Sequence, residues 1–390
     1  MGVAPLTELY RSLDVSIVLP CLNERDTVGA VVDEALSGLR SAGIDGEVIV
    51  VDNGSTDGSA EIAAAHGARV IHEERRGYGS AYLAGLAAAR GELIVLADAD
   101  GTYPLGNLTP LLEPLRNGAD LVLGSRFNET MEEGAMPFLN RWVGNPVLTG
   151  TLNLVFRAKV SDAHCGLRAV RRSALPTLDL QTTGMEFATE MVVKAAKRGL
   201  SIEEVPITYR VRGGESKLSP FKDGWRHLRF MLVHSPTFLF VVPGVALFVL
   251  GLSVLLALAG GPVEVLGRRW EIHSMILGAI TTLVGGQIVQ LGVFARTYAV
   301  LFLRERDRIY ERAAAHVNLE RGLLAGGAVL VTGIALFALV VASWIASGFG
   351  ALHEEHLSVL ALTLIGLGTQ ILFAAFFLSI LALGRRTGVR

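Results

Sequence analysis

Cysteine is scarce in this chain, and a surplus of positive charge is missing altogether. Only two cysteines, Cys21 and Cys165, occur in 390 residues, so the chain has neither a disulfide framework nor the ligand spacing of a structural zinc site. Both cysteines fit a reducing compartment. The 35 basic and 37 acidic residues give a formal net charge of −2. We expect no nucleic-acid partner, because such proteins carry a strong basic excess.

Two targeting and cofactor signals are also missing. Residues 1–14 contain acidic side chains and no apolar segment, so we do not expect them to form a secretory signal. The first strand-like run, 15–20, is not followed by a G-x-G-x-x-G turn, which argues against an NAD or FAD site. Gly77 and Gly79 have the wrong spacing and context for that motif, and we interpret them as part of a helix start or a loop.

Long apolar runs are abundant, but only in the second half of the chain. Hydrophobic residues make up 51% of the sequence. Four stretches are long enough to cross a hydrocarbon core of about 30 Å, which takes about 20 residues. The alternative, a large soluble helical core, rarely contains four uncharged runs of this length. We therefore predict a membrane domain over 236–390, with spans near 236–259, 272–295, 323–346 and 357–383.

Arginine is concentrated in two segments flanking these spans, the loop between the second and third spans and the C-terminus. The other loops hold only two arginines or a cluster of His and Glu. By the positive-inside rule, both termini and the N-terminal half face the cytoplasm, at what we expect to be a bacterial inner or plasma membrane. The residues of the two basic segments are Arg304, Arg306, Arg308, Arg312, Arg321, Arg385, Arg386 and Arg390.

The first half, 1–218, alternates short apolar runs with longer helical segments, which predicts an α/β domain with a mainly parallel, doubly wound sheet. We expect strands at 15–20, 47–52, 68–71, 92–97 and 119–125, and helices that include 24–41 and 77–90.

The junction between the halves, 219–235, has the pattern of an amphipathic helix in the lipid headgroup plane. It places Trp225, Leu228 and Leu232 on one side, with Lys222, Arg226 and Arg229 nearby. A plain linker helix is the alternative. The segment 135–160 mixes aromatic and basic residues, and it is either a second interfacial element or a core helix.

Two aspartates, Asp98 and Asp100, directly follow the apolar run 92–97. A strand of a parallel sheet presents ligand-binding residues at its carboxyl end. Paired carboxylates there suit a divalent cation beside a phosphorylated substrate, because Mg²⁺ prefers one or two carboxylates with substrate oxygens and water. A solvated acidic turn is the alternative, but the position after a buried strand favours ion binding.

Seven short motifs occur in order along residues 15–235. Together they resemble family 2 glycosyltransferases of GT-A fold, in particular the polyprenyl-phosphate branch that includes dolichyl-phosphate mannose and glucose synthases. The motifs are P-x-L-N-E from Pro20, V-D-N-G-S-T-D from Val51, D-A-D from Asp98, G-S-R-F from Gly124, D-A-H-C-G-L-R from Asp162, G-M-E-F from Gly184 and G-E-S-K-L from Gly214.

The resemblance implies an activity and its partners. A hexose would pass with inversion from a nucleotide sugar of the UDP-glucose or GDP-mannose class to a polyprenyl phosphate, with Mg²⁺ or Mn²⁺ as cofactor. An acceptor phosphate loses its second proton near pH ~6 and is already nucleophilic at neutral pH, so no strong general base is required. Membrane lipids are further partners, and a homo-oligomer is compatible with the pattern.

The resemblance also implies roles for individual residues. Asn53 stands where many relatives carry a second aspartate that contacts the base, which leaves uridine or guanosine open. Thr102 stands where several relatives carry Gln, so the metal would keep an extra water. Glu186 and Glu190 are either acceptor contacts or helix surface. The implied catalytic residues are Asp98, Asp100, Arg126 and Lys217; the nucleotide-sugar residues are Pro20, Glu24, Asp52, Asn53, Asp98, Ala99 and Asp100; the metal residues are Asp98, Asp100 and Thr102; the acceptor-phosphate residues are Arg126, Arg210, Arg212 and Lys217.

Two other functions are compatible with parts of this pattern. A polysaccharide synthase would thread its product through the membrane helices, but the Q-x-x-R-W motif expected of such synthases is missing from the sequence. A transporter or scaffold could use the α/β domain as a nucleotide sensor, but the predicted spans carry few charges for a transport pathway.

Overall fold

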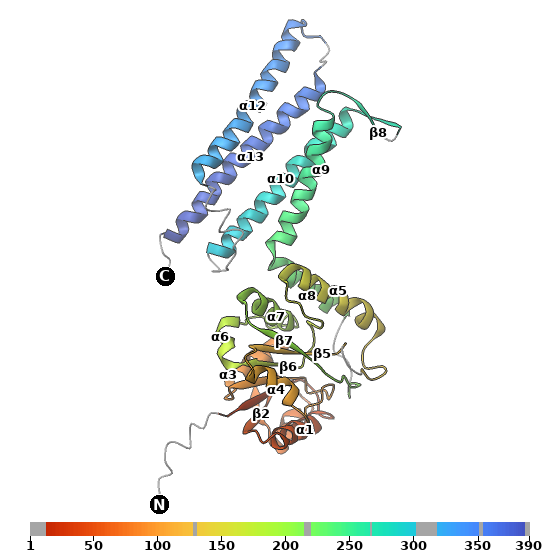
Figure 1. Ribbon diagram of the computed structural model, residues 1–390, viewed down its shortest axis with the longest axis vertical. Helices are drawn as coiled ribbons and strands as arrows, with labels where there is room; N and C mark the ends of the chain where they lie inside the picture. Colours follow the sequence, from red (N-terminus) through yellow and green to blue (C-terminus); the bar gives the residue numbers. More distant parts are fainter. Residues whose placement is uncertain are drawn as a thin grey trace, which may run out of the picture. The chain divides into compact units, whose positions relative to one another are not determined.

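The computed structural model describes residues 13–127, 131–213, 220–265, 267–301, 318–350 and 354–386. The chain forms two compact units, Met1–Met231 and Leu232–Arg390. The first contains the β-sheet and the second contains the long helices (Figure 1).

A seven-stranded sheet, in the order β3-β2-β1-β4-β6-β5-β7, forms the centre of the first unit. All neighbouring strands are parallel except that β6 runs antiparallel to both β4 and β5. This confirms the expected mainly parallel α/β sheet. The strands are β1 (Val15–Cys21), β2 (Gly46–Asp52), β3 (Arg69–His72), β4 (Leu93–Leu96), β5 (Leu121–Ser125), β6 (Arg168–Arg171) and β7 (Ile202–Pro206).

Strands β6 and β7 were not expected from the sequence, because neither has a clear apolar pattern. Strand β6 is four residues long and begins and ends with arginine, and β7 contains two consecutive glutamates. Each is held instead by backbone pairing to β5, which is buried along its whole length.

Helices cover both faces of the sheet. The first helix begins at Val28 and not at Glu24 as expected, because residues 24–27 form a turn in which Thr27 N and Val28 N donate to Glu24 O. The helices of this unit are α1 (Val28–Ser41), α2 (Ser59–Ala65), α3 (Tyr78–Ala88), α4 (Thr109–Arg116), α5 (Asn145–Phe156), α6 (Leu175–Leu178), α7 (Phe187–Arg198) and α8 (Pro220–Val233).

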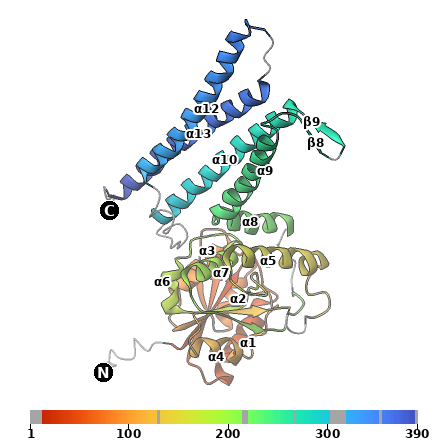
Figure 2. The same cartoon turned by 45° about the horizontal axis from the view of Figure 1, so that its top comes forward.

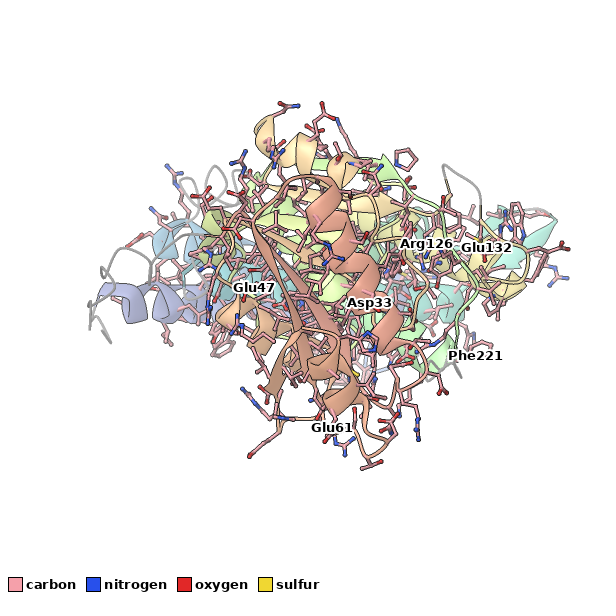
Figure 3. All side chains as sticks on the ribbon, turned by 90° about the horizontal axis from the view of Figure 1, so that it is seen from below. Asp33, Glu47, Glu61, Arg126, Glu132 and Phe221 are labelled. Atoms are coloured by element: carbon pink, nitrogen blue, oxygen red, sulfur yellow. The ribbon has the colours of Figure 1, made fainter. Side chains whose placement is uncertain are left out.

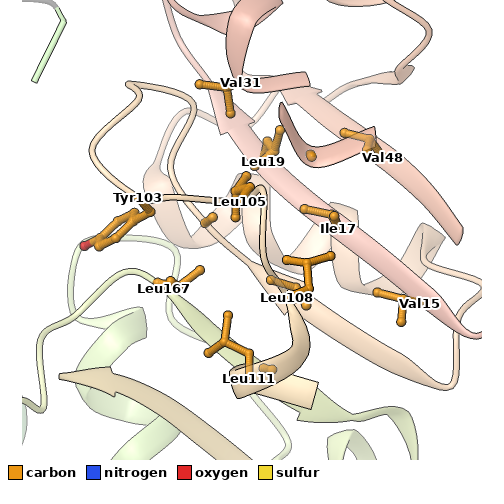
Figure 4. Close-up of a cluster of buried hydrophobic side chains, with 14 of the residues drawn as sticks. Val15, Ile17, Leu19, Val31, Val48, Tyr103, Leu105, Leu108, Leu111 and Leu167 are labelled. Carbon is orange, nitrogen blue, oxygen red and sulfur yellow. The ribbon is translucent and has the colours of Figure 1, made fainter. Parts of the chain in front are cut away.

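Alternate side chains of the central strands enter two separate hydrophobic cores. Ile17 and Leu19 of β1 pack into the core that includes α1, α2 and α4 (Figure 4). Val18 packs into the core that includes α3, α5 and α7, on the opposite face (Figure 2). This period of two is the pattern of a strand that is buried on both faces. Figure 3 shows Asp33 of α1, Glu47 of β2 and Glu61 of α2 among the charged side chains of this unit.

The antiparallel direction of β6 decides which loops meet at the carboxyl edge of the sheet. Leu96, at the end of β4, pairs with Arg168, at the start of β6. The loop that precedes β6 therefore lies beside the segments that follow β1, β2, β4 and β5. This edge brings residues 20–24, 52–53, 98–102, 126 and 162–166 close to one another.

Helix α8 packs against the second core through His227, Phe230 and Met231. The His227 Nδ1 atom lies 2.7 Å from the Thr189 hydroxyl of α7, and the ring meets His164 edge to face. Burial lowers the pKa of His227 to about 4, so the ring is neutral at pH 7.

The opposite face of α8 is exposed and amphipathic. Phe221 is 83% exposed and Trp225 is 58% exposed, next to Lys222 and Arg229. Leu228 instead packs partly against the core, so the structure separates it from Trp225. A second exposed apolar ridge covers α5 and the turn before it, with Phe138, Trp142, Val147 and Leu154 exposed. Leu152 of the same helix is fully buried, so α5 has both a core face and an exposed apolar face.

Within the described residues, the second unit contains four helices that are long and apolar enough to cross a membrane. They cover Thr237–Ala257, Ile272–Leu301, Leu319–Ala346 and Glu355–Leu383. These spans belong to α9 (Val242–Ala257) with the π-turn before it, α10 (Ile272–Leu301), α12 (Leu319–Ala346) and α13 (Glu355–Arg386). A short hairpin, β8 (Val263–Val265) and β9 (Arg268–Trp270), connects α9 to α10.

Glycines allow the membrane helices to approach closely in pairs. A Cβ on Gly285 of α10 would lie 2.3 Å from Phe248 N of α9, and one on Gly368 of α13 would lie 2.5 Å from Leu330 N of α12. Inside lipid the hydrophobic effect cannot drive helix association. Small residues at such contacts instead allow close van der Waals packing of the two helix backbones.

We expect Gly285→Leu to destabilise the membrane unit, because the added side chain overlaps the α9 backbone. Overpacking of about 1–3 kcal/mol would lower the unfolding temperature by about 3–10 °C in detergent. Gly327→Leu is the matched control, because a Cβ on Gly327 has no neighbouring atom within 4 Å among the described residues. Equal unfolding temperatures for the two variants would contradict the prediction.

We also expect acid to weaken the fold through His227. Its pKa is about 4 in the folded protein and about 6.5 in an unfolded chain, so the unfolded state binds more protons between these values. Stability is therefore lost as the pH falls from about 6.5 to about 4, by up to about 3 kcal/mol. Thermal unfolding of His227→Gln at pH 7 and at pH 4.5 should show a smaller pH effect than the wild type. An identical pH effect would show that His227 is not responsible.

Candidate active site

A cavity of about 370 Å³ opens at the carboxyl edge of the sheet. It brings together most of the residues that the sequence singled out. Of these, the cavity is lined by Pro20, Glu24, Asn53, Asp98, Ala99, Asp100, Arg126 and Arg212. Asp52, Thr102 and Arg210 are not among its lining residues, and Lys217, with the rest of the 214–219 segment, lies outside the described residues.

Asp98 is held by two tyrosines of α3. Its Oδ1 accepts hydrogen bonds from the hydroxyls of Tyr78, at 2.9 Å, and Tyr82, at 3.4 Å. Burial and then the charge of Asp100 raise the pKa of Asp98 to about 7, while the tyrosine hydrogen bonds and the charge of Arg212 oppose this shift. Burial and the nearby charge of Asp100 therefore disfavour the ionised carboxylate, and a bound cation would stabilise it.

Asp100 is oriented by its own loop. Its Oδ1 accepts from the Thr102 hydroxyl at 2.7 Å and from Thr102 N at 3.1 Å. Its Oδ2 lies 3.5 Å from Arg212 Nε. The Thr102 side chain is buried and directed at Asp100, so in this arrangement it orients the aspartate.

Asp52, the last residue of β2, and Asn53, which follows it, hold the neighbouring loops in place. Asp52 accepts from Ser55 N and lies 3.2 Å from the His72 ring. Burial raises the pKa of Asp52, but these hydrogen bonds outweigh it and lower the pKa overall.

Asn53 uses its whole amide group to fix the loop 73–77. Its Nδ2 donates to Glu73 O at 2.9 Å and to Arg75 O at 2.8 Å, and its Oδ1 accepts from Gly77 N at 2.7 Å. Gly77 has a φ of 145° at the start of α3, and a Cβ there would lie 2.2 Å from Thr183 O. This tight approach explains the two glycines at 77 and 79.

Arg126 forms a buried bidentate ion pair with Asp162. The Nε and Nη2 atoms of Arg126 lie 2.6 and 2.8 Å from the two carboxylate oxygens of Asp162. Both residues are buried, and the guanidinium also lies 5.3 Å from the centre of the Tyr209 ring. Asp162 therefore orients Arg126 and neutralises much of its charge.

The two other predicted arginines have different environments. Arg212 reaches the cavity and lies 3.0 Å from Glu24 Oε1. Arg210 makes a bidentate pair with Glu34 of α1, at 3.0 and 3.1 Å, and its side chain is directed away from the aspartates. The structure therefore brings Arg212, and not Arg210, next to Asp100.

Several cavity residues were not identified as site residues from the sequence. Tyr78, Arg76 and Met185 line the cavity, and so do Asp223 and His227 of α8. Met185 belongs to the G-M-E-F motif, and Asp223 and His227 belong to the predicted amphipathic helix, but neither pattern indicated that these side chains line a cavity.

Residues of the D-A-H-C-G-L-R and G-M-E-F motifs have mostly structural partners. His164 lines the cavity, and both of its ring nitrogens are buried and lack a hydrogen-bond partner in the part of the chain described. Glu190 does not line the cavity and is not helix surface: it is buried, pairs with Lys194 and accepts from Thr182 N. Glu186 does not line the cavity either.

The aspartate pair fits a divalent cation of the magnesium type. Asp98 and Asp100 each use Oδ1 for hydrogen bonds within the protein, and the described residues provide no such bond to either Oδ2. No group of three or more His, Cys, Asp or Glu side chains arranged around a metal position occurs among the described residues. Such a donor set leaves most of the coordination to water and substrate oxygens, as Mg²⁺ prefers.

Two family models match this chain. Residues 16–178 match glycosyl transferase family 2, and residues 293–382 match the glycosyltransferase family 2 C-terminal transmembrane region. The low-salt glycan biosynthesis hexosyltransferase Agl6 of Haloferax volcanii is 42% identical over 365 residues, which is 93% of this chain and 88% of that protein.

Two further proteins are similar over the first unit. A dolichyl-phosphate hexose transferase of Haloferax volcanii is 38% identical over 219 residues, which is 55% of this chain and 91% of that protein. The solved glucosyl-3-phosphoglycerate synthase of Mycobacterium tuberculosis is 26% identical with a TM-score of 0.47, covering 60% of this chain and 85% of that one. From the family models and the relative at 42% identity, together with the four apolar helices, this chain belongs to glycosyltransferase family 2 and is an integral membrane glycosyltransferase with a GT-A domain.

Proposed function

We propose that this enzyme transfers a hexose, with inversion, from a nucleoside diphosphate sugar to a polyprenyl phosphate at the cytoplasmic face of a membrane. The observation that carries the proposal is the cavity in which Asp98 and Asp100 lie with Arg126 and Arg212. The names of the relatives support the substrate classes, since they include a hexosyltransferase and a dolichyl-phosphate hexose transferase.

The donor would bind at the ends of β1, β2 and β4. Pro20, Glu24 and Asn53 line this side of the cavity. The Asn53 amide is fully used by the backbone of residues 73–77, so its role toward the base is indirect: it shapes the pocket wall. Arg76, which lines the same wall, supplies a cation near the nucleotide.

The chemistry requires neutralisation of the departing diphosphate. A Mg²⁺ or Mn²⁺ ion held by Asp98 and Asp100 would supply Lewis-acid stabilisation of that charge. Arg126, fixed by Asp162, keeps its position without reorganisation and presents its remaining N–H groups to phosphate oxygens. The acceptor phosphate is dianionic above pH ~6 and attacks without a protein base.

The acceptor would reach the cavity from the lipid surface. Helix α8 exposes Phe221 and Trp225, and the segment before α5 exposes Phe138 and Trp142, in each case beside basic side chains. This is the composition of elements that lie in the headgroup plane. We propose Arg212 and Lys217 as acceptor-phosphate contacts. Lys217 lies outside the described residues.

Incubation of the purified protein with Mn²⁺, a polyprenyl phosphate and labelled UDP-glucose or GDP-mannose tests this proposal. We expect label in the organic phase with at least one donor. Asp100→Ala should lower the rate by at least about 10³-fold, because it removes a group that would hold the metal. Asp33→Ala, on the surface of α1 and outside the cavity, is the control and should keep the wild-type rate. A panel of donors that yields no extractable label would contradict the proposal.

We expect Asn53→Asp to impair donor binding, although the substitution removes no group that would take part in sugar transfer. A carboxylate at this position would face the carbonyls of Glu73 and Arg75 with no N–H to donate, which costs about 1–3 kcal/mol for each unmade bond. The KM for the donor should rise at least about tenfold with a smaller change in kcat. Asn107→Asp, in an exposed turn, is the matched control. Unchanged donor KM in Asn53→Asp would show that the 73–77 loop does not shape the pocket.

A further inference from the structure

The segment 209–213 lies along the loop that carries the two aspartates. Arg210 N donates to Thr102 O at 3.0 Å, and Gly213 N donates to Asp100 O at 3.3 Å. These backbone bonds fix the position of Arg212 over the 98–102 loop. The 209–213 segment and the 98–102 loop are therefore held together by backbone hydrogen bonds.

The guanidinium of Arg212 bridges the two sides of the cavity. Its Nη2 lies 3.0 Å from Glu24 Oε1, on the donor side, and its Nε lies 3.5 Å from Asp100 Oδ2. Its side chain is only 23% exposed, and those of Glu24 and Asp100 are 10% and 8% exposed. The charge of Arg212 is therefore placed where a metal ion on the aspartates and the diphosphate attached to it would lie.

The two contacts of Arg212 differ in strength. The contact with Glu24 is a hydrogen-bonded ion pair, whereas the Nε of Arg212 is buried and has no hydrogen-bond partner within the described residues. At 3.5 Å, the contact with Asp100 is purely ionic. A divalent cation, with twice the charge, would compete successfully for Asp100 Oδ2 and would also repel the guanidinium.

We propose that Arg212 substitutes for the metal in the donor-free enzyme, and that metal and nucleotide sugar displace it from Asp100. This inference rests on the proposed function, in particular on Asp98 and Asp100 as metal ligands. Arg212 supplies the positive charge beside Asp100 while no donor is bound. Once displaced, its guanidinium is available for a phosphate.

Mn²⁺ titration of the full-length protein in detergent, followed by electron paramagnetic resonance without nucleotide, tests the substitution. Removal of the competing cation in Arg212→Gln should tighten Mn²⁺ binding about tenfold. Arg212→Lys keeps a positive charge, but a single ammonium group cannot bridge Glu24 and Asp100. We therefore expect its affinity for Mn²⁺ to lie between those of the wild type and Arg212→Gln. The control, Arg69→Gln, loses the same charge from an ion pair with Glu47 outside the cavity and should bind Mn²⁺ within about twofold of the wild type.

Asp100→Ala distinguishes the two ways in which the inference can fail. If Arg212→Gln binds Mn²⁺ no more tightly than the wild type while Asp100→Ala loses binding, the metal site stands and the substitution by Arg212 is wrong. If Mn²⁺ binding does not depend on Asp100 in any variant, the metal part of the proposed function is wrong, and the inference fails with it. Unfolding temperatures of all variants establish that each is folded.

Discussion

Two carboxylates at the end of a buried strand are the constraint around which the catalytic unit is organised. Burial of Asp98 and its repulsion by Asp100 both raise the pKa of Asp98. Neighbouring groups offset this repulsion: the hydroxyls of Tyr78 and Thr102 donate to them, and Arg212 lies beside Asp100. These groups come from three distant parts of the chain, namely helix α3, the 98–102 loop and the segment that contains Arg212, so the pair depends on the tertiary structure.

The antiparallel strand β6 makes this assembly possible. Because β6 runs against β4 and β5, the residues before it, 162–166, reach the same edge as the residues after the other strands. The buried guanidinium of Arg168 fastens this loop, donating to Cys165 O and Ala163 O and reaching Ala188 O of α7. Asp162 is thereby fixed opposite Arg126. A wholly parallel sheet would place this loop at the far edge.

The two units are stabilised by different interactions, because the first folds in water and the second has the apolar helices of a membrane domain. In the first, strand side chains enter two hydrophobic cores on opposite faces of the sheet. In the second, apolar side chains face outward and glycines bring helix backbones together in the pairs α9 with α10 and α12 with α13. Inside lipid, close packing replaces the hydrophobic effect as the source of helix association.

Much of the architecture follows from local patterns in the sequence. The strands after which Asp52 and Asp98 lie have continuous apolar runs, and the four membrane helices have lengths that no soluble core needs, so both were predictable. The short strand β6, with an arginine at each end, was not, because its conformation comes from pairing with β4 and β5 and not from its own composition.

The residue types of the candidate site were evident in the sequence, but their partners were decided only in the tertiary structure. The pattern D-A-D by itself determined that two carboxylates follow a buried strand. That Arg126 is paired with Asp162, that Arg210 is turned toward Glu34 while Arg212 reaches Asp100, and that the Asn53 amide is used by the 73–77 backbone all depend on contacts between segments far apart in the chain. The charge and hydrogen-bonding capacity of a side chain follow from its residue type. Its partner depends on which loops the fold brings to the same edge of the sheet.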